Sequence, residues 1–274
     1  MDLKKKMEAI KYPNVAGVFY PSEKEKLKLM LDSFISQNHE IQSFDGKIIG
    51  CISPHAGYIY SGTVAGKVYS HLKNFDQSKF WKVLIVAPSH YFGFSGLVFP
   101  NFKIYRTPLG DVKVGYLPAQ ITEIQLSIFE SNQPFEEEHA MEVQIPFLQR
   151  VLSNFEVYPV LAGNVSFRLV SELIQEFSKV ENSFFVISSD LSHYLPYNEA
   201  IETDSETIKN IESLITDSSD RIDACGKIGI LGAMDAAKKL SWKIKLVDYK
   251  NSGDTAGDKK RVVGYGSFLV IKEL

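Results

Sequence analysis

Three of the six histidines in this 274-residue chain stand at the ends of hydrophobic, strand-like runs. The runs are residues 48–55, 83–90 and 184–193, and they end in His55, His90 and His193. In an open α/β sheet, the carboxyl ends of the strands border a common crevice where ligands bind. Three imidazoles at such an edge would suit metal binding or proton transfer. One histidine at the start of a loop would carry little weight, but three of six indicate a functional site.

Two of these histidines lie in short motifs with turn residues. In PHAGY, Pro54 ends the strand before His55, and Gly57 permits close approach of the backbone. His90 lies in PSHY, which follows the second run in the same way. Each histidine alone is equally well explained as a hydrogen-bonded structural residue. On neighbouring parallel strands, we favour both as metal ligands.

The third run carries a carboxylate three residues before its histidine. If this segment turns helical, Asp190 and His193 project to the same side. Such a pair suits a general base oriented by a carboxylate, or a brace that fixes the tautomer of an imidazole. The alternative is an aspartate that caps a helix, with a surface histidine nearby.

The two cysteines differ in their surroundings. Cys225 stands at the start of an apolar helix expected over residues 226–240, and a helix N-terminus lowers the pKa of a thiol and favours the metal-binding thiolate. The opposing interpretation is a buried cysteine that acts as a small hydrophobic residue, which fits Cys51 inside its apolar strand. Two cysteines cannot form a disulfide framework, and this suits a reducing cytoplasm.

A further histidine lies in the acidic segment EEEHAME. A helix is expected over residues 138–152, and it would place His139 and Glu142 on one face, like half of a carboxylate metal site. Alternatively, the acids complement the helix dipole and His139 has no role. The chain has no zincin motif, P-loop, nucleophile elbow or dinucleotide fingerprint, which argues against nucleotide hydrolysis and serine-esterase chemistry.

Helices alternate with strands along the chain. This order predicts an α/β fold, a three-layer α/β/α sandwich around a mostly parallel, mixed sheet. A helix near residues 63–72 joins the first two histidine-ended strands into a strand–helix–strand unit. Other helices are expected near residues 22–34, 118–129, 167–180 and 198–214, and other strands near residues 157–161, 244–249 and 262–271. Because composition does not break and no repeat is visible, we expect a single domain over residues 1–274.

The composition limits the class of protein. Hydrophobic residues make up 45% of the chain and charged residues 23%, the usual balance for a globular protein with a full core. The net charge of −3 gives no support to binding of nucleic acid or anionic membranes. No stretch approaches the roughly 20 apolar residues that span a bilayer, and no secretory signal follows the basic start. We expect a cytoplasmic protein that binds neither nucleic acid nor membrane.

Taken together, eight segments resemble the Memo family. They are VAGVFYP (15–21), PHAGYIYSG (54–62), APSHY (87–91), IYRTPLGD (104–111), EEEHAMEVQIPFLQ (136–149), SSDLSHY (188–194), ACG (224–226) and NSGDTAGDKKRVVGYGS (251–267). They occur in order over nearly the whole chain. Bacterial and archaeal members are called AmmeMemoRadiSam system protein B, after neighbouring AMMECR1-type and radical-SAM proteins. The resemblance therefore implies these proteins as partners, beside an unknown small molecule or peptide.

The family's fold is similar to that of LigB-type class III extradiol dioxygenases, which bind non-haem Fe(II) through two histidines and a glutamate. By this resemblance, His55 and His90 match the two ligand histidines, and Cys225 replaces the glutamate. His193 matches the acid/base histidine, with Asp190 beside it. The implied cofactor is one metal ion, with Fe(II) favoured. Two imidazoles and a thiolate are a softer ligand set that would also suit copper or Zn(II).

Three functions follow from these observations. The first is a metal-dependent redox enzyme, dioxygenase-like, that acts on an unknown small substrate. The side chains that could line its pocket or brace its ligands are Tyr58, Tyr91, Arg106, His139 and Glu142. Packing or structural hydrogen bonds would also explain the first three. The second is a non-catalytic protein that binds peptides or proteins in a vestigial pocket, since the animal Memo protein is linked to phosphopeptide binding. The third is a partner in radical-SAM-linked modification.

Overall fold

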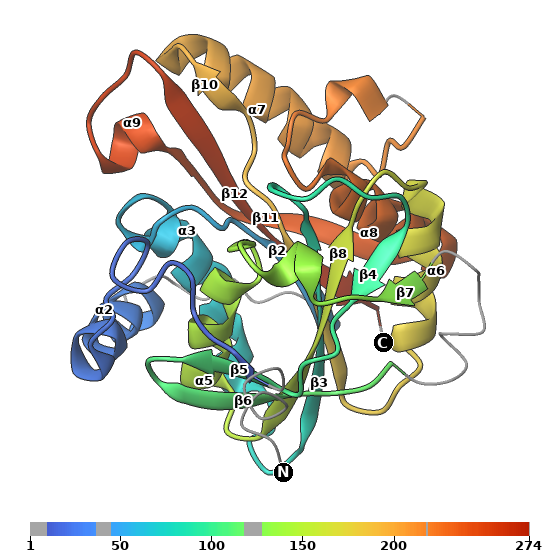
Figure 1. Cartoon of the computed structure of the whole chain (residues 1–274). Coiled ribbons are helices and arrows are strands. Elements are labelled where there is room, and N and C mark those ends of the chain that lie inside the picture. Colours follow the sequence, from blue (N-terminus) through green and yellow to red (C-terminus); the bar gives the residue numbers. More distant parts are fainter. Residues whose placement is uncertain (1–9, 37–44, 118–127, 218, 274) are drawn as a thin grey trace, which may run out of the picture.

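All strands in the described part of the chain join one mixed sheet. The computed structural model describes residues 10–36, 45–117, 128–217 and 219–273. The helix expected near residues 118–129 falls mainly outside these ranges. The strand order is β1-β5-β6-β8-β3-β9-β2-β12-β10 (Figure 1). In addition, β11 pairs with β12, β4 pairs with β8, and β7 pairs with β4.

The centre of the sheet is parallel and buried. It consists of β8 (Phe155–Ala162), β3 (Trp81–Pro88), β9 (Ser183–Ser188) and β2 (Lys47–Ser53). The sequence of β3, WKVLIVAP, is apolar almost throughout, as expected for a parallel strand that is covered on both faces. These strands fix the positions of the histidines that follow them.

Shorter and antiparallel strands complete both edges. Beside β2 lie β12 (Val262–Lys272), β11 (Trp242–Asn251) and β10 (His193–Leu195), all in antiparallel pairs. Beside β8 lie β6 (Gly110–Val114), β5 (Ile104–Thr107), β1 (Ile10–Lys11), β4 (Leu97–Phe99) and β7 (Ile128–Glu130). The prediction of a mostly parallel, mixed sheet is confirmed.

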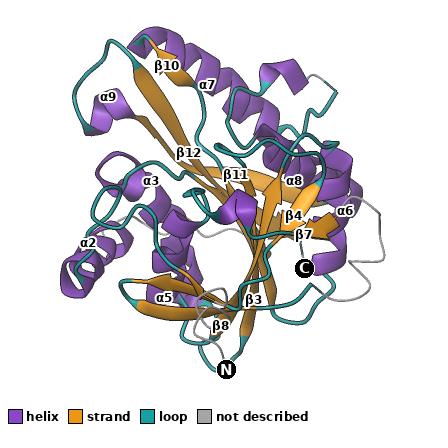
Figure 2. Cartoon of the chain, viewed as in Figure 1, coloured by secondary structure: helices purple, strands orange, loops and turns teal. Residues whose placement is uncertain are grey.

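Helices cover the sheet on both faces (Figure 2). One layer contains α2 (Lys24–Ser36), α3 (Tyr58–Ser70) and α5 (Ile145–Val151). The other contains α6 (Phe167–Phe177) and α8 (Lys227–Leu240), and α7 (Tyr197–Glu212) continues it along β11 and β12. The three-layer α/β/α prediction is therefore confirmed. Within the described ranges, no helix is long and apolar enough to cross a membrane.

Two segments near the site differ from the expected secondary structure. The helix predicted over residues 138–152 is wrong in its first part, because α5 begins only at Ile145 after a short 3₁₀ turn at Glu142–Gln144. Pro146 lacks an N–H group and is tolerated only in the first turn of a helix, so it fixes this start. The segment after β9 is also not helical, and it leads directly into β10 at His193.

Candidate metal centre

The order of the central strands brings the predicted site together. Strand β9 lies between β2 and β3, with Ser53 opposite Ser188 and Val86 opposite Ile187. The carboxyl ends of these three strands are therefore neighbours. His55 and His90 each follow their strand by two residues, and the centroids of their rings are 5.1 Å apart.

Cys225 reaches the same point from the loop before α8. Its Sγ lies 3.2 Å from Nε2 of His55, and it accepts a hydrogen bond of 3.3 Å from the backbone N–H of Asp190. Ligand atoms of His55, His90 and Cys225 all lie within 4.8 Å of one another. The structure thus brings together the two imidazoles and the thiol that the resemblance implies as metal ligands.

The protonation of His55 follows from its neighbours. The hydroxyl of Ser188 donates to the carbonyl of Ala140 at 2.6 Å, so it can only accept from Nε2 of Gln144 at 2.8 Å and from Nδ1 of His55 at 3.0 Å. Nδ1 of His55 therefore carries the hydrogen, and the lone pair of Nε2 faces Cys225. Burial lowers the pKa of His55 to about 3, so the ring is neutral near pH 7.

Glu138 orients His90 in a similar way. The buried carboxylate accepts from the backbone N–H of His90 at 2.6 Å and from Nδ1 of its ring at 3.0 Å. A carboxylate only accepts, so Nδ1 of His90 carries a hydrogen and Nε2 is the ring nitrogen left for a metal ion. Burial alone would raise the pKa of Glu138, but the hydrogen bonds with His90 outweigh it and bring the pKa to about 2. Sequence reasoning missed Glu138, because it stands in a run with the exposed Glu136 and Glu137.

His139 adds a third imidazole to the cluster. Its ring is stacked on that of His90 at 4.9 Å and stands edge-on to that of His55 at 5.6 Å. Ligand atoms of His90, Glu138 and His139 form a second group within 4.8 Å. Burial, with the neighbouring His55, lowers the pKa of His139 to about 4. The structure therefore places His139 beside His55 and His90.

Glu142 is not part of this cluster, and the expected helix face shared with His139 is wrong. Its carboxylate accepts from the backbone N–H groups of Asn14 at 2.6 Å and Val15 at 2.9 Å, and from the hydroxyl of Tyr20 at 2.6 Å. The acid is completely buried, and it holds the segment before α2 against the protein. Its role in the described structure is to anchor that segment.

Asp190 and His193 border the cluster from the third strand end. Oδ1 of Asp190 accepts from the backbone N–H of His55 at 2.7 Å, which ties the ends of β2 and β9 together. Burial raises the pKa of Asp190, while this hydrogen bond and the electrostatic interaction with His193 oppose the rise. His193 is half-buried and pairs with Val263 of β12. The two residues are neighbours because of the loop and β10, and not because of a helical turn.

The thiol of Cys225 differs from the expectation of a lowered pKa. Burial and the nearby Asp190 raise its pKa to about 12, although hydrogen bonds from backbone N–H groups oppose the rise. The N-terminus of α8 does not lower the pKa of the thiol enough to offset the increase caused by burial. The metal-free protein therefore carries a neutral thiol, and a metal ion that binds Sγ must displace its proton.

The remaining candidates lie in three different environments. Tyr58 is buried among core aromatic rings, and its hydroxyl donates to a backbone carbonyl at 2.6 Å. Arg106 forms two hydrogen bonds with Asp111, of 2.6 and 2.7 Å, within the β5–β6 hairpin. Tyr91 is 57% exposed, and its hydroxyl lies 3.4 Å from Nδ1 of His139. Tyr91 is thus the one of these three with a described contact to the imidazoles.

Comparison with known proteins gives consistent results over almost the full length. A family model described as "Memo-like protein" matches residues 11–269. A "MEMO1 family protein" of Archaeoglobus fulgidus is 34% identical over 95% of this chain and 99% of the relative. Proteins with the same description from Aquifex aeolicus and Thermoplasma volcanium are 34% and 31% identical, covering 93% and 97% of this chain and 97% and 100% of the relatives.

Proposed function

The chain belongs to the Memo family, and from this premise we propose that it is a metal-dependent redox enzyme that acts on a small substrate. His55, His90 and Cys225 would hold one metal ion, with iron(II) favoured over copper and zinc. The observation that carries the proposal is the convergence of their ligand atoms within 4.8 Å. The donor set fits such an ion, because the Nδ1 atoms of both imidazoles are held by hydrogen bonds and their Nε2 atoms are the ring nitrogens left for the metal. When bound, the ion would supply Lewis acidity and redox chemistry.

The surrounding residues have separate tasks in this proposal. Ser188 and Glu138 orient the two imidazoles, and Asp190 holds the loop of His55 through its backbone. His193, half-buried at the rim, would transfer protons to or from the substrate. His139 borders the site beside His90 and restricts the space left for a substrate.

Elemental analysis of anaerobically purified protein tests the metal site. We expect close to one metal ion per chain in the wild type and a loss in both His55→Ala and Cys225→Ser. Cys51→Ser is the matched control, since Cys51 is completely buried within β2. No metal in any sample, even after anaerobic reconstitution with iron(II) or copper, would contradict the proposal, as would equal effects of the two cysteine substitutions.

A second substitution separates the ligands from the acid/base residue. His193→Ala should leave the metal content at the wild-type level, and it should abolish oxygen-dependent turnover of any substrate found by screening. Loss of the metal from this variant would instead make His193 a ligand.

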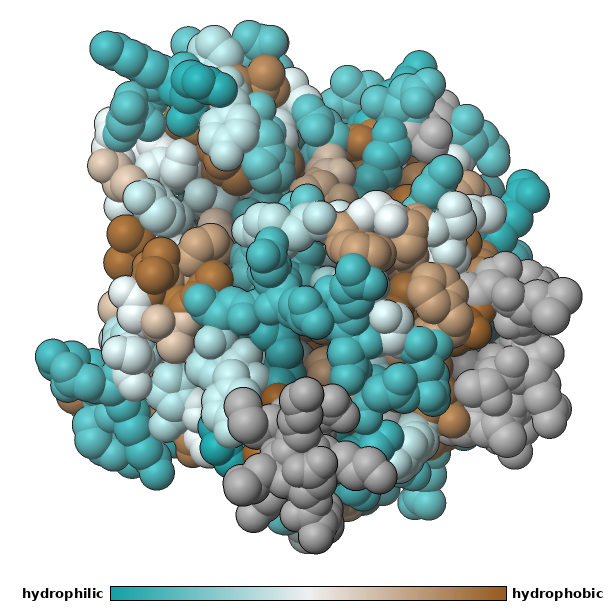
Figure 3. Space-filling view, in the orientation of Figure 1, coloured by the Kyte–Doolittle hydropathy of each residue, from teal (hydrophilic) through white to brown (hydrophobic). Residues whose placement is uncertain are grey.

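Exposed hydrophobic residues around the cluster favour a second candidate function, recognition of a peptide or protein such as an AMMECR1-type or radical-SAM partner. Ile59, at the start of α3, is 65% exposed, and Val18 is 80% exposed beside Phe19, which contacts His139. Figure 3 shows hydrophobic side chains on this face over the start of α3. Large exposed apolar patches commonly mark interaction sites. If the double variant His55→Ala, His90→Ala binds a partner with the affinity of the wild type, recognition without metal chemistry is favoured.

A further inference from the structure

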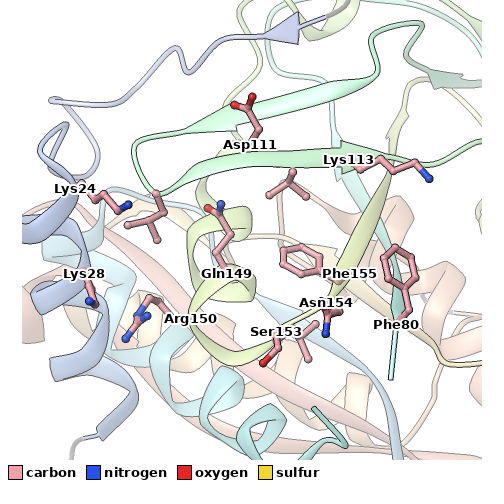
Figure 4. Close-up of a pocket in the computed structure, with 13 residues that line it drawn as sticks. Lys24, Lys28, Phe80, Asp111, Lys113, Gln149, Arg150, Ser153, Asn154 and Phe155 are labelled. Carbon is pink, nitrogen blue, oxygen red and sulfur yellow. The ribbon is translucent and has the colours of Figure 1, made fainter. Parts of the chain in front are cut away.

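A cavity of about 500 Å³ lies at the opposite edge of the sheet from the imidazoles (Figure 4). Phe80 directly precedes β3 and Phe155 begins β8, and both line this cavity. His90 follows the far end of β3, which is 8 residues long. At about 3.3 Å per residue, the cavity and the metal centre are roughly 25 Å apart. The two sites share no residue.

One end of the cavity is cationic. Lys24 and Lys28 project from α2, and Arg150 lies beside them at the end of α5 (Figure 4). Arg150 is neutralised by Asp32, with hydrogen bonds of 2.7 to 2.9 Å. Lys24 and Lys28 have no carboxylate within ion-pair distance among the described residues. Their two charges are therefore available to a ligand.

The positions of these two lysines do not stabilise α2. They are four residues apart on one helix, where like charges destabilise the helix. They also lie towards the N-terminus of α2, where the helix dipole favours negative charge. An anion between the two side chains would remove both penalties.

The other end of the cavity is aromatic. Phe155 is half-buried, and Phe80, a large apolar side chain of a type usually found in the core, is 48% exposed. Figure 4 shows the two rings at the end of the cavity remote from Lys24 and Lys28. Leu109 lines the space as a further apolar side chain. Asp111 and Lys113 also line the cavity, and they are paired with Arg106 and Glu156. The two lysines of α2 and the two aromatic rings thus lie at opposite ends of the cavity (Figure 4).

We propose that this cavity is a second ligand site, which binds a small organic anion. Its carboxylate or phosphate group would be held by Lys24 and Lys28, and its flat apolar body would lie against Phe80 and Phe155. The volume lies within the range of small-molecule sites, which is about 300 to 1,000 Å³. Arg150 cannot serve as the main anchor, because Asp32 already occupies its guanidinium group. Binding here does not require the metal centre.

Calorimetric titration of metal-free protein with 1-naphthoate tests this proposal, with 1-naphthamide as the neutral probe of the same shape. We expect saturable binding of naphthoate at low ionic strength, and about tenfold weaker binding of naphthamide, equivalent to about 1.4 kcal/mol. The double variant Lys24→Gln with Lys28→Gln should weaken naphthoate binding by a similar factor. The matched control is Lys209→Gln with Lys238→Gln, which removes two exposed lysines from α7 and α8.

Two more variants distinguish binding in this cavity from binding elsewhere on the protein. Phe80→Ser should weaken both probes, while His55→Ala should weaken neither, since it alters only the metal centre. The melting temperature of the Lys24→Gln, Lys28→Gln variant should equal or exceed that of the wild type, which excludes unfolding as the cause of lost binding. Any of four results would overturn the proposal. They are no saturable binding of naphthoate, equal affinity for the two probes, an equal loss of naphthoate affinity in both double lysine variants, and a loss of naphthoate affinity in His55→Ala.

Discussion

Glu138 holds both the ring and the backbone of His90. Its Oε1 lies 3.0 Å from Nδ1 of the ring, and its Oε2 lies 2.6 Å from the backbone nitrogen. Oε1 also accepts from the N–H groups of His139 and Ala140, at 2.9 and 2.8 Å. One buried carboxylate therefore fixes the loop after β3 and the direction of the imidazole, and it leaves Nε2 as the ring nitrogen available to a metal ion. Such carboxylate–histidine pairs orient the ligands of metal sites.

Substitution Glu138→Gln should weaken metal binding without removing a ligand. The amide has one acceptor oxygen in place of two, so His90 loses either its backbone or its ring partner. We expect roughly a 10- to 100-fold decrease in metal affinity, measured by competition with a chromophoric chelator. Glu137→Gln is the matched control, because Glu137 is the exposed neighbour. An equal affinity in the two variants would remove the orienting role of Glu138.

Substitution Ser188→Ala should act through the tautomer of His55. It removes the oxygen that accepts from Nδ1, so Nδ1–H no longer has a fixed partner. The expected result is about a tenfold loss of metal affinity, together with a loss of about 1 to 3 kcal/mol in the free energy of unfolding. Ser171→Ala in α6 is the control, since this buried hydroxyl also accepts a hydrogen bond but lies outside the site. Comparable losses of affinity in the two variants would contradict the assignment.

The sequence allowed the sheet and the main site residues to be predicted, for a physical reason. The apolar runs that end in His55 and His90 mark buried parallel strands, and the ends of such strands meet at one edge. In the structure these ends do meet, and Cys225 lies 3.2 Å from His55. The meeting of the strand ends depends on local apolar patterns and on a general rule of topology, whereas the place of Cys225 in this site followed from the resemblance to the Memo family.

The residues that brace the site could not be found in this way. Glu138 and Ser188 carry no local signal, because an acid in an acidic run and a serine at the end of a strand are usually solvent-exposed or structural. Their roles depend on contacts across 48 residues of sequence, from Glu138 to His90 and from Ser188 to Ala140. The pKa of Cys225 was misjudged for a related reason. Its burial is set by the packing of the loop against β9, and only the assembled fold reveals it.

Substitution Gly226→Ala should disturb the position of the neighbouring Cys225. A Cβ at this position would lie 2.6 Å from Cβ of Ser189 and 2.7 Å from the carbonyl oxygen of Ser188, too close for either atom. We expect a loss of about 1 to 3 kcal/mol in unfolding free energy and a clear decrease in metal affinity. Gly93→Ala is the control, since no atom lies within 4 Å of a Cβ there. Wild-type metal affinity in Gly226→Ala would show that the thiol does not depend on this close packing.

The buried Asp204 should make stability fall as the pH rises. Burial raises its pKa, although hydrogen bonds from the Ser192 N–H and the Tyr249 hydroxyl, of 3.0 and 2.8 Å, oppose the rise. The folded protein therefore holds this proton more tightly than the unfolded chain, whose aspartates titrate near pH 4. Its contribution to stability is complete below that pH and is lost as the pH rises through the folded pKa.

This pH dependence of the unfolding free energy can be measured by urea unfolding of the wild type and of Asp204→Asn at a series of pH values. The asparagine can still accept from Ser192 and donate to Tyr249, so the variant should fold. We expect the unfolding free energy of the wild type to decrease relative to the variant as the pH increases from about 3 to 7. Glu202→Gln, at an exposed position of the same helix, should show no such trend. A constant difference between wild type and Asp204→Asn over this range would mean that Asp204 has the same pKa in both states.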